Sequence, residues 1–210
     1  MKGLKSIVAA LLIIIFSGSA LSAQSDDYRF TVKTNPLNAL AGPFWLIVVP
    51  LSGEYIALFE AKTFEKQSIQ IGLSYVGPSP LLNLDDIVST TGDVDVRTSG
   101  FRFQLMNKFF ISRDLQAPAG FYLAPHFSYA SMKIVDRDDR DNNLGATRMN
   151  INATLGYQII TAGGFALDIY TGLGFLQTGF SLSGDLFEED EFDKASRINV
   201  PLGFTFGFAF

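Results

Sequence analysis

Large apolar residues alternate with small or polar residues along much of this chain. The clearest example is the C-terminal stretch, where every second residue is a large apolar one: Ile198, Val200, Leu202, Phe204, Phe206, Phe208 and Phe210. Successive side chains of a β-strand point to opposite faces of the sheet. The pattern therefore predicts a strand with one apolar face and one polar face. Either a soluble sandwich or a membrane barrel would produce it.

The same alternation predicts eight strands, at residues 28–38, 53–62, 67–77, 97–110, 120–133, 146–160, 164–179 and 195–210. The connections at 61–66, 111–119 and 161–164 are short, and those at 78–96, 134–145 and 180–194 are long. An even strand number with alternating short and long connections is typical of a closed antiparallel transmembrane β-barrel, with short periplasmic turns and longer extracellular loops. The proline-containing segment 39–52 leaves open where the first hairpin turns.

The first 23 residues have the order of a secretory signal peptide. Lys2 and Lys5 precede the apolar run Ile7–Phe16, and small residues follow up to Ala23. We expect cleavage after Ala23, which leaves a barrel domain at 24–210; an uncleaved anchor is the alternative. Export together with the barrel pattern predicts the outer membrane of a Gram-negative bacterium. The chain has no cysteine, which excludes lipoprotein attachment, disulfides and thiolate metal sites.

The charge balance is acidic and argues against nucleic-acid binding, which needs basic patches. The chain has 21 acidic and 16 basic residues, and the signal peptide carries two of the basic ones. The acidic residues gather in the long connections, where we expect solvated surface loops rather than calcium sites. The stretch Asp136–Asp141, for example, lacks the glycine and the terminal glutamate of an EF-hand loop. Residues Leu81–Ser89 are compatible with one short amphipathic helix. We expect no cofactor and no metal.

Charged residues on the polar faces of the predicted strands form the best candidate constellation. They are Glu54, Glu60, Arg102, Lys108, Arg148, Asp168 and Arg197. In a membrane barrel these side chains point into the lumen, where charges must be paired or hydrated. They would form a network that fills the barrel, or they would line a selective pore. We favour the network because eight strands leave an interior just wide enough for side chains.

The signal peptide pattern, the alternation over 67–210 and the terminal stretch Gly203–Phe210 together resemble small eight-stranded bacterial outer-membrane barrels. In such proteins the barrel assembly machinery reads the last strand and its terminal aromatic residue, so the resemblance implies that Phe210 is an assembly signal. It also implies a monomer in contact with membrane lipid and lipopolysaccharide. The segments Lys33–Leu37 and Gly53–Tyr55 are similar to an uncharacterised family of these barrels.

The only histidine lies in His126-Phe127-Ser128, which resembles the His-x-Ser motif of outer-membrane lipid A deacylases. However, Tyr129 stands where an asparagine usually follows, and the alternation points His126 inward, away from a lipid substrate. We therefore expect a non-enzymatic barrel with a structural or surface-interaction role and with no catalytic residues. A small-solute channel and a lipid-modifying enzyme are the two alternatives.

Overall fold

The computed structural model describes residues 28–40, 42, 45–46, 49–50, 52–79, 96–139, 141–183 and 191–210. The predicted signal peptide, the stretch Leu81–Ser89 and most of the acidic residues of the first and third long connections lie outside these ranges. No helix of the described residues is long and apolar enough to cross a membrane.

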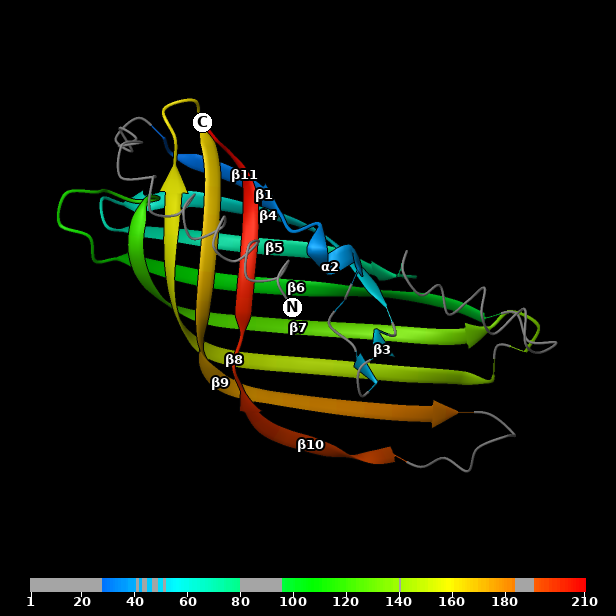
Figure 1. The fold of residues 1–210 in the computed structure, drawn as a ribbon. Coiled ribbons are helices and arrows are strands. Elements are labelled where there is room, and N and C mark those ends of the chain that lie inside the picture. Colours follow the sequence, from blue (N-terminus) through cyan, green and yellow to red (C-terminus); the bar gives the residue numbers. More distant parts are fainter. Residues whose placement is uncertain are drawn as a thin grey trace, which may run out of the picture.

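The chain forms one antiparallel sheet that closes on itself (Figure 1). Its segments are β1 (Phe30–Thr34), β4 (Gly53–Phe64), β5 (Gln67–Gly77), β6 (Val96–Phe110), β7 (Gly120–Asp136), β8 (Asn143–Ile160), β9 (Phe165–Ser183), β10 (Glu191–Asn199) and β11 (Leu202–Ala209). Both β10 and β11 pair with β9, and from Ala195 onward they share one register, with Ile198 opposite Phe175 and Leu202 opposite Thr171. They are one strand interrupted at Pro201, which has no N–H to donate. The predicted all-β, closed eight-stranded barrel is therefore confirmed.

The first and last strands close the barrel over a short distance. Strand β1 pairs with β11 at only four positions, from Thr31 opposite Ala209 to Thr34 opposite Phe206. The prediction of a strand over 28–38 was too long, because Asn35 and Pro36 turn the chain into the short helix α2 (Leu37–Leu40). The Asn35 side chain accepts a hydrogen bond from the Leu37 N–H at 3.0 Å, and proline is favoured at the first position of a helix. The two-residue strands β2 (Trp45–Leu46) and β3 (Val49–Pro50) follow.

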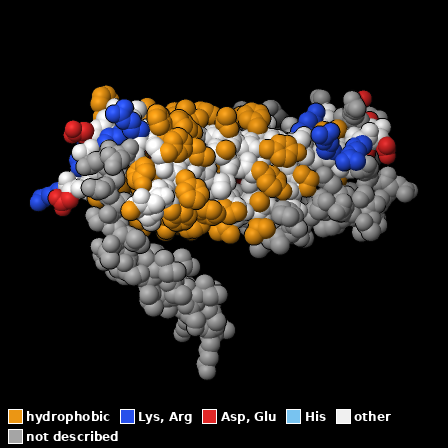
Figure 2. Space-filling view, turned by 90° about the horizontal axis from the view of Figure 1, so that it is seen from above, with side chains coloured by type: hydrophobic (Ala, Val, Ile, Leu, Met, Phe, Trp, Pro, Cys, Tyr) orange, Lys and Arg blue, Asp and Glu red, His pale blue; other side chains and the backbone are white. Residues whose placement is uncertain are grey.

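The barrel is apolar outside and polar inside, as the alternation predicted. Tyr55, Phe59 and Leu73 are exposed, whereas the polar residues between them on the same strands, such as Glu54, Glu60 and Ser74, are buried. Figure 2 shows apolar side chains over the middle of the wall and charged side chains near its two ends. In water this arrangement would expose a continuous apolar surface, whereas in a bilayer it places that surface against lipid.

The short connections and the last residue lie at one end of the barrel, and the strand ends that flank the long connections lie at the other (Figure 1). We expect cysteine at Asp139 to react with a membrane-impermeant thiol reagent on intact cells, and cysteine at Gly163 to react only after the outer membrane is opened. A side chain at Gly163 meets nothing within 4 Å, so this substitution leaves the short turn undisturbed. Reaction at Gly163 alone on intact cells would reverse the proposed orientation.

Candidate functional site in the barrel interior

Four charged side chains meet inside the barrel on the side of the short turns. Lys33 Nζ lies 2.6 Å from Glu60 Oε2 and 3.0 Å from Asp168 Oδ2. Lys108 Nζ lies 3.3 Å from the same Glu60 oxygen and 2.6 Å from the same Asp168 oxygen. All four side chains are fully buried. The charges of the two lysines and the two carboxylates cancel. We refer to Lys33, Glu60, Lys108 and Asp168 as the lumen cluster.

Neutral side chains complete the hydrogen bonding of the lumen cluster. Gln158 Oε1 accepts hydrogen bonds from both lysines, at 2.7 Å each, and the Tyr122 hydroxyl donates to Asp168 Oδ1 at 2.8 Å. Thr31 and Ser68 donate to Glu60. Together these side chains come from β1, β4, β5, β6, β7, β8 and β9, so they converge from nearly the whole circumference. Buried charges are tolerated when they are paired and hydrogen-bonded in this way.

Glycines opposite two tyrosines let aromatic rings lie across the interior. Tyr122 pairs with Gly156 across β7 and β8, and Tyr170 pairs with Gly203 across β9 and β11. A Cβ at Gly156 would stand 2.3 Å from the Tyr122 ring, and one at Gly203 would stand 2.0 Å from the Tyr170 ring. These close approaches explain why the inward face of the strands carries glycine at these two positions.

A second ion pair lies nearer the long loops. Arg102 Nη1 is 3.0 Å from Glu54 Oε2, and Asn38 Nδ2 of helix α2 donates to the same oxygen at 2.9 Å. Ser74 donates to the other oxygen of the Glu54 carboxylate. This contact ties the helix that follows the first strand to the interior of the barrel.

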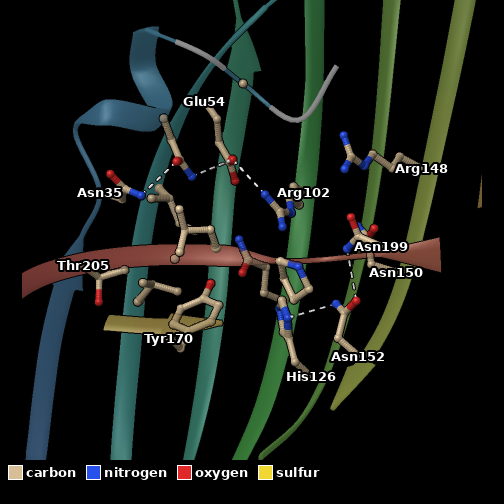
Figure 3. A pocket seen from close by; sticks show the side chains of 18 of the residues that line it. Asn35, Glu54, Arg102, His126, Arg148, Asn150, Asn152, Tyr170, Asn199 and Thr205 are labelled. Carbon is tan, nitrogen blue, oxygen red and sulfur yellow. Dashed lines mark hydrogen bonds and ion pairs between the residues drawn. The ribbon is translucent and has the colours of Figure 1, made fainter. Parts of the chain in front are cut away.

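A polar cavity of about 220 Å³ adjoins this ion pair (Figure 3). Its polar lining consists mainly of amide and charged side chains: Asn35, Asn38, Glu54, Arg102, Gln104, His126, Arg148, Asn150, Asn152, Tyr170, Asn199 and Thr205. Among the described residues, the buried atoms Arg102 Nε, His126 Nε2, Asn150 Oδ1 and Thr205 Oγ1 of this lining have no hydrogen-bond partner. The cavity therefore offers unused donors and acceptors to whatever enters it.

The structure divides the residues that the sequence placed in one lumen network. Glu60, Lys108 and Asp168 belong to the lumen cluster, Glu54 and Arg102 form the second pair, and Arg148 lines the cavity. Arg197 is exposed and joins neither group. Lys33, which binds both carboxylates of the cluster, was not among the predicted residues. Its position on the polar face of the first strand, between Thr31 and Asn35, was the signal that would have identified it.

His126 and Ser128 both point inward from β7, as the alternation predicted, and both are buried. The His126 ring contacts Asn152 through Nδ1 at 3.3 Å. The Ser128 hydroxyl accepts a hydrogen bond from Asn150 Nδ2 at 3.0 Å. No hydrogen bond joins His126 to Ser128 within the described part of the chain. The two side chains therefore contact different asparagines of β8 inside the barrel.

In the second long connection, acidic side chains accept hydrogen bonds from neighbouring residues of the same loop. Asp136 Oδ1 accepts from the Asp138 N–H at 3.0 Å, and Asp139 Oδ2 accepts from Asn142 Nδ2 at 2.9 Å. These are local turn contacts. Among the residues that the structure describes, no group of three acidic or histidine side chains is arranged to hold a metal ion.

Comparisons with protein-family models, with curated proteins and with solved structures gave no match.

Proposed function

We propose that this protein is a non-enzymatic barrel of the Gram-negative outer membrane, with a closed lumen and a structural or surface-interaction role. The exposed apolar wall and the polar interior support placement in a membrane. The acidic composition of the long connections supports a role at the cell surface, since these connections would face outward in the orientation proposed above.

The lumen cluster is the main observation in favour of a closed lumen. Its lysines contact carboxylates of β4 and β9 at 2.6–3.3 Å, and every one of its side chains is inaccessible to water. A water-filled pore needs a continuous hydrated path, and its lining charges would be hydrated rather than paired across the barrel. The paired, buried charges of the cluster on the side of the short turns therefore favour the structural interpretation over a small-solute channel.

The test is the conductance of the purified barrel in planar bilayers. We expect no steady conductance step under voltages at which a porin, reconstituted in the same bilayers as a positive control, conducts. Insertion of the barrel is verified separately by its heat-modifiable migration in detergent gels. Reproducible conductance steps of uniform size would contradict the closed lumen and support the small-solute channel.

A further inference from the structure

The described strands leave an interruption in the hydrogen-bonded wall beside the polar cavity. Strand β1 ends at Thr34, so β10 and the adjoining part of β11 have no strand partner on that side among the described residues. The cavity extends to both borders of this interruption, with Asn35 and Asn38 on one and Val200 and Leu202 on the other. We call this interruption the side opening. Its helical border, α2, is held to β4 through Asn38 and Glu54.

The border formed by the last strand is strongly apolar. Val200 and Leu202 are 65% and 83% exposed, and they line the cavity as well. In the membrane placement proposed above, these two side chains meet lipid where the polar cavity begins. A molecule at the side opening would therefore contact polar and apolar surroundings at the same time.

Among the described residues that line the cavity, Arg102 and Arg148 are basic and Glu54 is acidic. Figure 3 shows the two arginine side chains projecting toward the cavity from β6 and β8. His126 Nε2 and Arg102 Nε, two nitrogens that can donate a hydrogen bond, have no partner among the described residues, and the His126 side chain is more than nine-tenths buried. This combination of cations and unused polar atoms suits an anionic group with oxygen acceptors.

We propose that the cavity binds the anionic headgroup of a membrane amphiphile, whose alkyl chain leaves through the side opening past Val200 and Leu202. The lumen cluster lies beyond the cavity, toward the short turns. The proposal rests on the membrane placement proposed above, because the bilayer supplies the ligand. It does not rest on the role of the loops.

The first experiment measures binding to the barrel purified in dodecyl maltoside, with dodecyl phosphate as the probe. We expect saturable binding with one ligand per barrel, at least tenfold weaker binding by Arg148→Gln, and partial recovery in Arg148→Lys. Arg113→Gln is the matched control, because Arg113 is exposed at the short-turn end. Heat-modifiable migration verifies that each variant is folded. Equal affinity of Arg148→Gln and Arg113→Gln, or no saturable binding, would overturn the proposal.

The second arm separates an amphiphile from a free anion. Inorganic phosphate and butyl phosphate share the headgroup chemistry and lack the long chain, so we expect both to bind at least tenfold more weakly than dodecyl phosphate. Equal affinity for inorganic phosphate would make the cavity a site for soluble anions and would contradict the role of the side opening.

The third arm locates the alkyl chain. In a Trp45→Phe background, Leu202→Trp places a fluorophore at the side opening, and Leu155→Trp places one on the apolar face of β8. At one ligand per barrel, dodecyl phosphate brominated on its chain should quench the fluorescence of the Leu202→Trp variant more strongly than that of the Leu155→Trp variant. Equal quenching at both positions would show that the chain only partitions into the detergent. Conductance in bilayers would refute the closed lumen without affecting this result, so the two proposals fail separately.

Discussion

Replacing Lys108 with methionine is expected to lower the free energy of unfolding by about 3–5 kcal/mol, the usual cost of removing one partner of a buried ion pair. Lys108 contacts both carboxylates of the lumen cluster, and its ammonium group also lies 4.6 Å from the centre of the Tyr122 ring. Without it, Glu60 and Asp168 share one lysine, and an unbalanced negative charge remains in a site that water does not reach. Urea unfolding of the barrel in lipid vesicles measures the change.

The control is Lys133→Met, the same replacement at an exposed position on β7. Solvent-exposed charges contribute little to stability, so this variant should unfold within about 0.5 kcal/mol of the wild type. A loss of stability equal to that of Lys108→Met would mean that methionine in a strand, rather than the broken cluster, causes the effect.

The double variant Lys108→Met with Asp168→Asn isolates the charge imbalance. It leaves Lys33 with Glu60, which are 2.6 Å apart, and the remaining cluster is neutral. The asparagine side chain can still accept the hydrogen bond of the Tyr122 hydroxyl. We therefore expect the double variant to be more stable than the sum of its two single variants, by about 1–3 kcal/mol, the range seen for residues in one network. Strictly additive losses would contradict a coupled cluster.

The inside and outside of the barrel could be predicted because a membrane strand repeats the same contrast at every second residue. Ile151 and Leu155 are exposed on β8, whereas Asn150, Asn152 and Thr154 are buried beside them. Burial of this kind depends only on which face a residue occupies, and the face follows directly from its position in the alternation. From residue 53 onward the predicted strand boundaries lie within four residues of the observed ones for the same reason, but the interruption at Pro201 inside the predicted strand 195–210 was missed.

The partners of the lumen charges could not be predicted from faces alone. The alternation predicts that Glu60 and Glu54 both point inward. It does not predict that Glu60 pairs with Lys33 of β1, or that Glu54 pairs with Arg102 of β6. Those contacts depend on height along the barrel and on the pairing of the first strand with the last. That pairing joins residues at opposite ends of the chain, such as Val32 and Phe208, and no local pattern encodes it.

The side opening was also beyond sequence analysis. The segment 39–52 combines prolines with apolar residues and has no consistent period. Asn35 and Pro36 do favour a helix start, but the alternation of the preceding strand extends through Asn35 and conceals it. Because of this early turn, part of β11 has no described partner on the β1 side. Recognising this requires the register of β11 against both of its neighbours.

Deleting Phe210 is expected to abolish most of the folded barrel in the envelope. The Phe210 N–H donates to the Phe30 carbonyl oxygen at 2.9 Å, and its own carbonyl oxygen accepts from the Arg29 and Phe30 N–H groups at 3.1 and 3.0 Å. These bonds extend a closure that has only four residue pairs. Because a sheet edge in lipid leaves backbone groups without partners, shortening this closure is costly. Heat-modifiable migration of envelope samples measures the folded fraction.

The variant Phe210→Ala separates closure from recognition by the assembly machinery, since alanine preserves the backbone bonds and removes only the ring that lies 6.1 Å from the Phe30 ring. If the terminal aromatic residue is an assembly signal, Phe210→Ala should reduce the folded barrel in cells several-fold and still refold in detergent after purification. The control Phe208→Ala removes a ring of similar exposure from the same face, 62% against 61%, and should assemble normally. Normal assembly of Phe210→Ala in cells would restrict the role of Phe210 to its backbone, and an undiminished barrel after deletion would contradict both roles.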